Sequence, residues 1–173
     1  MKDLTFHRLQ KLREKYGPGI FGKITQKLLA LAFYDADFPH VVERGVQGVD
    51  IDVANPAGVK YALEVKTTDE RSIPLSKENI DALQARASDG YVPLIAGLRM
   101  RPLEDWIIAN IPLSQLHPGT LPFRRLRAHR MRQLEMSVCP AFEAVVDQHF
   151  SGVLSGGERY LIKILDGRRG GFS

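Results

Sequence analysis

Apolar residues in the first 115 positions recur at two spacings, which predict helices in some segments and strands in others. In the helical segments they return every three or four positions, so that they gather on one face. One of these segments also carries a start signal, because Ser76 can cap it and Glu78 lies in its first turn. This spacing predicts helices over residues 4–16, 22–34 and 77–88.

Shorter apolar runs between and after these helices have the length and composition of strands. Two of the runs are joined by a tight turn that contains Pro56 and Gly58, which predicts an antiparallel hairpin. The resulting order, α-α-β-β-β-α-β-β, is typical of the α/β class, with a mixed central sheet flanked by helices. The predicted strands cover residues 39–45, 49–55, 60–67, 91–100 and the start of 105–116.

The pattern changes after residue 116. The stretch "HPGTLP" predicts a turn, and the basic residues 123–136 and the amphipathic residues 140–154 favour helices. Residues 158–166 read as a strand, and the Gly- and Arg-rich end as a loose tail. We therefore expect a core over residues 1–115 and a C-terminal α+β extension, residues 116–173, packed on that core.

Composition narrows the class of protein. The 173 residues are 44% hydrophobic and 25% charged, which is ordinary for a soluble globular protein. No apolar run approaches the roughly 18 residues of a membrane span, and the polar N-terminus lacks a secretory signal. Cys139 is the single cysteine, which excludes an internal disulfide and a Cys-rich zinc site. These features favour a cytoplasmic protein without a membrane partner.

The net charge of +4 comes from the C-terminal third of the chain. Residues 1–115 hold 15 basic and 15 acidic side chains, whereas residues 116–173 hold 9 basic and 5 acidic ones. A local basic excess is typical of a surface that binds a polyanion such as nucleic acid, and equally of an ordinary solvated surface. Charge alone leaves both readings open.

The predicted hairpin contains four charged residues inside apolar runs: Asp50, Asp52, Glu64 and Lys66. Burying a charge costs free energy unless another group pairs with it. Because side chains alternate along a strand, the two aspartates share one face, as do Glu64 and Lys66. Pairing of the strands then brings Asp50 across from Glu64 or diagonal to it.

Two carboxylates this close raise each other's pKa unless a cation lies between them. Mg²⁺ or Mn²⁺ fits, because these ions prefer carboxylate and carbonyl oxygens, and the Val65 carbonyl offers a further ligand. The ammonium of Lys66 can stabilise a hydroxide and the negative charge that develops on a phosphate. The alternative is an exposed polar face whose cross-strand ion pairs contribute a few tenths of a kcal/mol.

Residues 48–68, "GVDIDVANPAGVKYALEVKTT", resemble the core of the PD-(D/E)xK nuclease superfamily, which has the restriction-endonuclease-like fold. In that family one core strand carries an aspartate and the next a Glu-x-Lys, matched here by Asp50, Glu64 and Lys66. The surrounding elements match the family's αβββαβ core over roughly residues 20 to 111. Trp106 and the following "IANIPLSQL" are most similar to the archaeal-type Holliday junction resolvases.

The resemblance implies a Mg²⁺- or Mn²⁺-dependent endonuclease that hydrolyses phosphodiester bonds in DNA, either at branched junctions or at duplex restriction sites. It implies that Asp50, Glu64 and the Val65 carbonyl bind the metal and that Lys66 positions the attacking water. It also implies a homodimer.

One position departs from the family pattern. Where the first core helix often carries a glutamate, this chain has Gln26, a neutral side chain. Asp52 is a second accessory candidate, and we interpret Glu43 as an ordinary strand-edge charge. Gln26 keeps open a different class of function, a catalytically inactive nuclease fold that serves as a DNA-binding or assembly module. A metabolic enzyme acting on a small phosphorylated substrate is a third possibility.

Basic side chains supply the candidate DNA contacts. Within residues 121–133 a run of arginines contains no acidic residue, which favours a phosphate clamp or, alternatively, a solvated helix face. The candidates are Arg124, Arg125, Arg127 and Arg130 in this run, and Lys23, Arg44, Arg71 and Lys77 nearer the hairpin.

Overall fold

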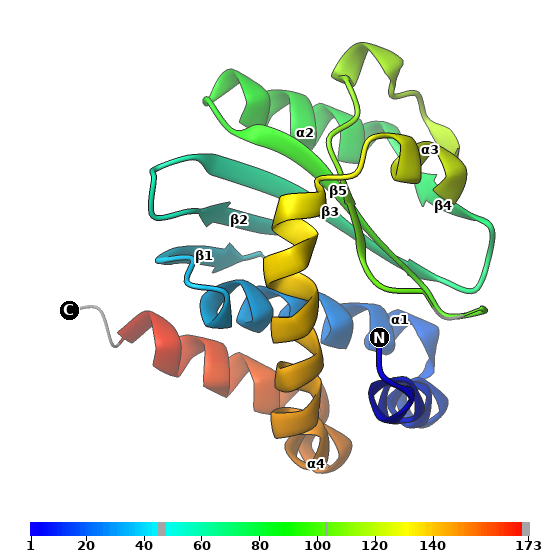
Figure 1. The fold of residues 1–173 in the computed structure, drawn as a ribbon, viewed down its shortest axis with the longest axis vertical. Coiled ribbons are helices and arrows are strands. Elements are labelled where there is room, and N and C mark those ends of the chain that lie inside the picture. The colour runs from blue at the N-terminus through cyan, green and yellow to red at the C-terminus, as the bar shows by residue number, and fades with distance from the viewer. Residues whose placement is uncertain (45–47, 103, 171–173) are drawn as a thin grey trace.

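The structure, a computed structural model, describes residues 1–44, 48–102 and 104–170. Figure 1 shows helices packed on both sides of a twisted sheet. The elements are α1 (Asp3–Asp35), β1 (His40–Glu43), β2 (Ile51–Ala54), β3 (Lys60–Thr68), β4 (Ser72–Leu75), α2 (Lys77–Ser88), β5 (Val92–Arg99), β6 (Ile107–Ala109), the 3-10 turn η1 (Leu113–Gln115), β7 (Gly119–Pro122), α3 (Phe123–Ala128) and α4 (Arg132–Gly170).

The main sheet is mixed, as the sequence predicts. Its order is β1-β2-β3-β5-β6. The hairpin is confirmed, because β2 and β3 pair antiparallel, whereas β5 runs parallel to β3 after the chain crosses over through α2. The α2 boundaries agree with the expected helix, and the Ser76 hydroxyl accepts a hydrogen bond from the Asn79 N–H as a cap. The α/β class with a mixed sheet is therefore confirmed.

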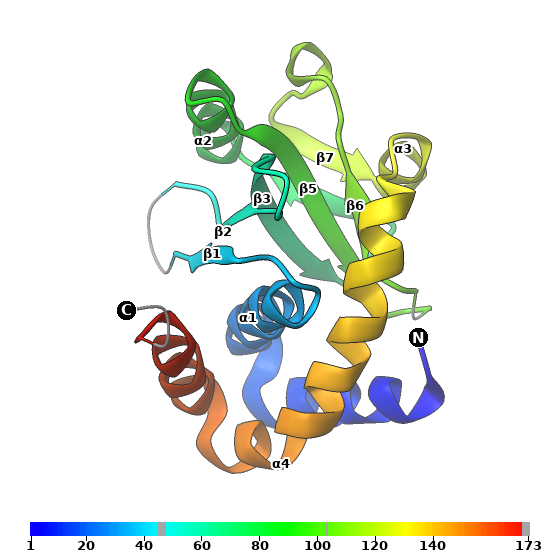
Figure 2. The ribbon, with the colours of Figure 1, turned by 60° about the vertical axis from the view of Figure 1, so that its left-hand side comes forward.

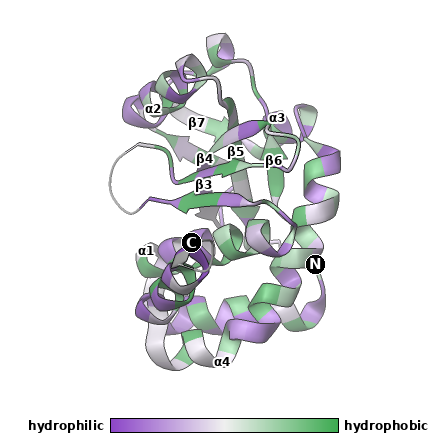
Figure 3. Ribbon diagram, turned by 90° about the vertical axis from the view of Figure 1, so that its left-hand side faces the viewer, coloured by the Kyte–Doolittle hydropathy of each residue, from purple (hydrophilic) through white to green (hydrophobic). Residues whose placement is uncertain are grey.

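Two apolar layers enclose this sheet. On one side, Leu63 and Val65 of β3 pack in a cluster with α1 and α4. On the other side, Ala62 of β3 and Ile95 of β5 pack with α2 and α3, as the separation of these helices in Figure 2 illustrates. Figure 3 shows the central strands as mostly hydrophobic. Even-numbered residues of β3, which include Glu64 and Lys66, therefore face α2.

The first two predicted helices form one element with a break. Gly17 has φ 76° and ψ 166°, outside helical geometry and in a region that glycine adopts readily, and Pro18 follows it. The part after the break is buried almost continuously from Leu28 to Phe33, between the sheet and α4. This buried part of α1 packs against β1, β2 and β3 on one face of the sheet.

The strand predicted over residues 158–166 is wrong, because these residues belong to helix α4. Leu161 and Leu165 lie one helical turn apart and are both buried, whereas Ile162 and Lys163 are exposed. The helix is broken at Gly157, and its final part lies beside α1 (Figure 2).

Two short strands were not predicted. β7 lies in the stretch expected to be a turn, and it pairs antiparallel with β4, so that residues 119–122 join residues 72–75 in a second, two-stranded sheet. The extension thus contacts the first 115 residues through β7 as well as through α3 and α4. Among the described helices, none has the length and apolar character that a membrane crossing requires.

Candidate active site

The register of the hairpin brings the two predicted carboxylates together. Ile51 lies opposite Leu63 and Asp52 opposite Ala62, so Asp50, the residue before β2, lies beside Leu63 to Val65 of β3. The Asp50 N–H donates to the Leu63 carbonyl at 3.0 Å, and the Asp50 carboxylate accepts from the Val65 N–H at 2.7 Å. Asp50 is therefore held against β3 by both its backbone and its side chain.

The two oxygens of Glu64 have different surroundings. Its Oε1 lies 2.7 Å from the Lys66 ammonium and accepts from the Asn79 amide at 2.6 Å. Its Oε2 is buried and has no hydrogen-bond partner among the described residues. Because the Glu64 side chain is only 2% exposed, a bare oxygen there costs free energy unless a further group binds it.

Burial and the repulsion between the carboxylates perturb their protonation. Burial and the nearby charge of Asp50 raise the pKa of Glu64 to about 7, although Lys66 opposes the shift. Burial also raises the pKa of Asp50, against the opposing effects of the Val65 N–H and Lys66. A divalent cation between the two carboxylates would relieve this strain, because it favours their charged forms.

These residues fit a hard metal ion. The bare Glu64 oxygen and the Asp50 carboxylate supply anionic ligands, and the Val65 carbonyl belongs to the strand segment between Glu64 and Lys66. Across the described ranges, no group of three or more His, Cys, Asp or Glu side chains is arranged to hold a metal. An ion at this site would therefore depend on backbone and water oxygens for its remaining ligands, as Mg²⁺ commonly does.

Gln26 does approach this site from α1. Its Nε2 donates to Glu43 Oε1 at 2.9 Å, to the Arg44 carbonyl at 3.0 Å and to the Asp50 carbonyl at 3.4 Å. The amide thus ties the end of β1 to the residue before β2. Gln26 therefore lies close to Asp50 and presents N–H donors to its neighbours.

The interpretation of Glu43 as an ordinary strand-edge charge is wrong. Its side chain is 8% exposed and lies 2.8 Å from the ammonium of Lys27, which is also buried and lies 3.1 Å from Glu158 of α4. The charge of Glu43 contributes to the raised pKa of Asp50, although less than burial does. The acid nearest to Asp50 on this side is therefore neutralised by a lysine.

Asp52 is engaged with arginines. This buried carboxylate, 4% exposed, accepts through Oδ2 from Arg44 Nε at 3.0 Å and Nη2 at 2.8 Å, and also from Arg86 of α2. Arg44, one of the candidate DNA contacts, is thus fixed on Asp52, with its side chain 41% exposed.

The remaining candidate DNA contacts fall into two groups. Lys23, Arg71 and Arg124 are exposed. The others have protein acceptors: Lys77 pairs with Asp81, Arg125 donates to Gln115, Arg127 pairs with Glu104, and Arg130 pairs with the buried Glu135. The arginine run of residues 124–130 therefore does not form one uninterrupted cationic face.

Sequence reasoning missed two residues around the site, Asn79 and Arg86. Asn79 also closes the capping box of α2, since its Oδ1 accepts from the Ser76 N–H at 3.0 Å. Its position three residues after a capping serine could have indicated that role, but not its contact with Glu64. The position of Arg86 depends on how α2 docks on the sheet, which no local pattern reveals.

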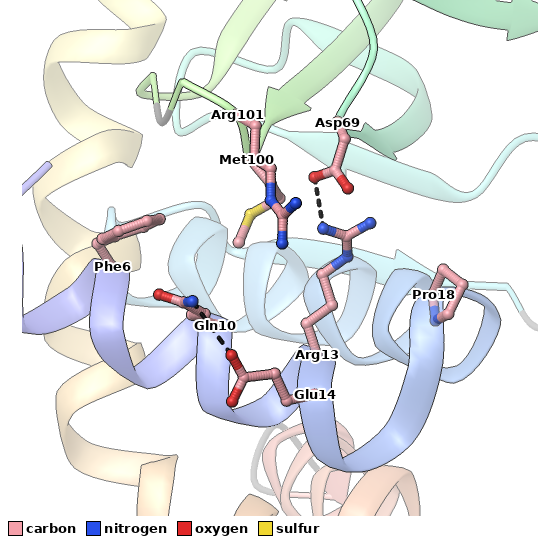
Figure 4. A pocket seen from close by; sticks show the side chains of 8 residues that line it. All are labelled: Phe6, Gln10, Arg13, Glu14, Pro18, Asp69, Met100 and Arg101. Carbon is pink, nitrogen blue, oxygen red and sulfur yellow. Dashed lines mark hydrogen bonds and ion pairs between the residues drawn. The ribbon is translucent and has the colours of Figure 1, made fainter.

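A separate cavity has a volume of about 240 Å³, and Figure 4 shows the side chains that line it. It lies between the N-terminal half of α1 and the ends of β3 and β5, where Arg13 pairs with Asp69 beside Phe6 and Met100. Asp50, Glu64 and Lys66 are not among its lining residues. This cavity is therefore distinct from the carboxylate site.

Comparison with known proteins places the fold. No family model matches the chain, and a search of curated proteins found no match. A solved structure of Archaeoglobus fulgidus Hjc, a Holliday junction resolvase from an archaeal hyperthermophile, matches with a TM-score of 0.53 and 18% sequence identity. The match covers 67% of this chain and 96% of the resolvase chain. With its αβββαβ core and mixed sheet, the chain has the restriction-endonuclease-like fold.

Proposed function

We propose that this protein is a metal-dependent DNA endonuclease, with Asp50, Glu64 and Lys66 as its catalytic residues. The observation that carries the proposal is the buried, bare Oε2 of Glu64. This residue is bonded to Lys66 through its other oxygen and precedes Val65, whose N–H donates to the Asp50 carboxylate. A cation that binds both carboxylates explains why such a costly arrangement is kept on two central strands.

In this proposal Asp50, Glu64 and the Val65 carbonyl hold Mg²⁺ or Mn²⁺. When bound, the ion supplies a water of lowered pKa and polarises the phosphate. Lys66 is 24% exposed and anchored on Glu64 Oε1, so its ammonium can reach a phosphate at the surface. There it orients the attacking water and stabilises the negative charge that develops on phosphorus. Asn79 is a positioning residue, because it acts through Glu64.

The fold match suggests the first substrates to test. The neighbour is a Holliday junction resolvase by its title, and we propose branched DNA as the substrate class, with duplex restriction sites as the alternative. Cutting of two strands would follow from a homodimer, which we also propose. The exposed Lys23, Arg71 and Arg124 are candidate phosphate contacts. We place the activity in the cytoplasm, where a single free cysteine stays reduced.

A catalytically inactive DNA-binding or assembly module is the second candidate. The observation that favours it is the environment of Gln26, whose amide nitrogen bonds to Glu43 and to backbone carbonyls. With Gln26 engaged in this way, Asp50 and Glu64 are the two carboxylates left to bind the metal. This candidate predicts DNA binding without cleavage.

Cleavage assays separate the two candidates. The protein is incubated with Mg²⁺ or Mn²⁺ and with labelled four-way junction, linear duplex and supercoiled plasmid DNA, and parallel reactions contain EDTA. We expect metal-dependent cleavage of at least one substrate and intact DNA in EDTA. Tight binding of DNA with no cleavage of any substrate would reject the nuclease and favour the inactive module.

Asn79→Ala is expected to weaken Mn²⁺ binding and cleavage by roughly 10- to 100-fold, the usual effect of losing a partner that orients a metal ligand. Without the amide at 2.6 Å, Glu64 Oε1 keeps only Lys66 and the carboxylate can rotate. Mn²⁺ binding is followed by electron paramagnetic resonance, which needs no turnover.

The matched control for this variant is Ser76→Ala. It removes the hydroxyl that caps α2 and leaves the Asn79–Glu64 hydrogen bond in place. It should lower the free energy of unfolding by about 1 kcal/mol and leave Mn²⁺ affinity unchanged. Equal losses of affinity in both variants would show that Asn79 acts only through the stability of the helix.

A further inference from the structure

Two guanidinium groups converge on one buried oxygen beside the carboxylate site. Arg44, at the end of β1, donates through Nε and Nη2 to Asp52 Oδ2, and Arg86, in the last turn of α2, donates to the same atom. The other oxygen of Asp52 is buried without a hydrogen-bond partner among the described residues. A single carboxylate therefore holds two cations side by side.

Other charged side chains lie around this pair. Arg86 lies over the ring of Tyr91 at 4.9 Å, and the ammonium of Lys60 lies 5.5 Å from the same ring. Among the described residues, the other acid in contact with the arginines is Asp89, 3.3 Å from Arg86 and 60% exposed, so water screens its charge. Arg44 and Arg86 thus share the buried carboxylate of Asp52, and the third cation, Lys60, lies against the same Tyr91 ring as Arg86.

Both arginines retain donors for a ligand. Arg44 uses Nε and Nη2 on Asp52, and its side chain is 41% exposed. The Arg86 side chain is 22% exposed, and within the part of the chain that the structure describes its Nη1 has only the 3.3 Å contact to Asp89. A guanidinium fixed by a carboxylate on one edge and open on another is arranged to receive a phosphate with little loss of side-chain freedom.

The arginine pair is linked rigidly to the carboxylate site. Asp52 follows Asp50 by two residues, so the two lie at most about 7 Å apart along the backbone. The Arg44 N–H also donates to the Asp50 carbonyl at 2.9 Å. The same residue therefore contacts Asp50 through its backbone and Asp52 through its side chain, which fixes the distance between the two sites.

We propose that Arg44 and Arg86, held on Asp52, form a binding site for a backbone phosphate of the nucleic acid, next to the phosphate that lies at Asp50 and Glu64. The inference rests on the proposed function, and it adds Arg86 as a DNA contact. It also gives Asp52 a task other than metal binding, that of holding the two arginines together. The ligand is a phosphodiester, recognised by charge and planar donors without reading the base sequence.

The test measures DNA binding in EDTA, so that it does not depend on cleavage. Fluorescence anisotropy gives the affinity of labelled four-way junction and duplex DNA over about 50 to 200 mM salt. Arg86→Gln should weaken binding by about tenfold, the effect of one charge-assisted contact. It should also lower the slope of log K against log salt by about 1, because one phosphate contact is lost.

Two further variants complete the design. Arg159→Gln makes the same change of charge on the exposed surface of α4 and should retain wild-type affinity and slope. Arg86→Lys keeps the charge and loses the planar fork, so it should retain the slope and bind more weakly than wild type. Thermal unfolding confirms that each variant is folded.

Equal binding by the wild type and Arg86→Gln would overturn the inference and leave the proposed function standing. Equal weakening by Arg86→Gln and Arg159→Gln would also overturn it, because only general charge would then matter. Failure of the wild type to bind either DNA would reject the proposed function itself. Binding without cleavage would reject the nuclease alone, and the phosphate site would stand.

Discussion

Replacement of Lys66 by alanine is expected to lower the rate of DNA cleavage by roughly a thousandfold, the upper range for loss of one preorganised charge at a transition state. The ammonium lies 2.7 Å from Glu64 Oε1 and is partly exposed, where it can contact water and phosphate together. DNA affinity should change by less than about twofold, because binding depends on many phosphate contacts.

Single-turnover cleavage and anisotropy, measured on the same preparation, test this expectation. Lys163→Ala is the matched control, since Lys163 is an exposed lysine on α4, and it should cleave at the wild-type rate. Wild-type cleavage by Lys66→Ala would refute the role assigned to Lys66. A parallel loss of binding and cleavage would instead identify Lys66 as a DNA contact.

The second large effect concerns stability. In the absence of divalent metal, the free energy of unfolding should fall as pH rises from about 5 to about 8. The folded protein holds the Glu64 proton up to a pKa of about 7, whereas the unfolded chain releases it near the ordinary value of 4.5. Between these values the folded state binds more protons, so stability decreases with pH. The loss from Glu64 is roughly 3 kcal/mol.

Glu64→Gln should remove most of this pH dependence, and at pH 8 without metal it should be more stable than the wild type. Asp50, whose pKa burial also raises, contributes a remaining decrease of the same sign. Denaturant unfolding in EDTA at several pH values gives the free energy of unfolding of the wild type and of Glu64→Gln. Glu70→Gln, which changes an exposed carboxylate two residues beyond β3, is the control and should follow the wild-type curve.

Metal addition completes this test. Mg²⁺ should restore the stability of the wild type at pH 8, because a ligand that binds only the folded state stabilises it, and it should have little effect on Glu64→Gln. If the free energy of unfolding of the wild type stays constant or increases between pH 5 and pH 8, burial and mutual repulsion do not raise the pKa values of these carboxylates.

The hairpin and α2 could be predicted because their signals are local. Pro56 and Gly58 favour a short turn, and this local signal is enough to predict the antiparallel pairing of β2 with β3. The prediction of a strand over residues 158–166 was wrong because the apolar residues of "YLIKIL" fit the spacing of a strand as well as that of a helix. Contact with α1 favours the helix. The strands β4 and β7 escaped prediction because each has only four residues and a distant partner.

Around the site, Asp50, Glu64 and Lys66 could be proposed from the sequence, but the side chains that contact them could not. Asn79 and Arg86 reach β3 and β2 from opposite ends of α2, a consequence of helix docking that no short motif encodes. Glu43 looked solvent-exposed because its partner Lys27 lies in a helix sixteen residues earlier. The arginine run looked like a clamp because acceptors such as Glu104 and Gln115 lie outside it.

The central claim is that Asp50 and Glu64 share a divalent cation. A crystal structure obtained with Mn²⁺, with anomalous scattering recorded near the manganese edge, tests it most directly. We expect an anomalous peak bonded to Glu64 Oε2, to the Asp50 carboxylate and to the Val65 carbonyl, with Lys66 beside it. Well-ordered carboxylates at saturating Mn²⁺ with no peak between them would show that Asp50 and Glu64 do not share a cation.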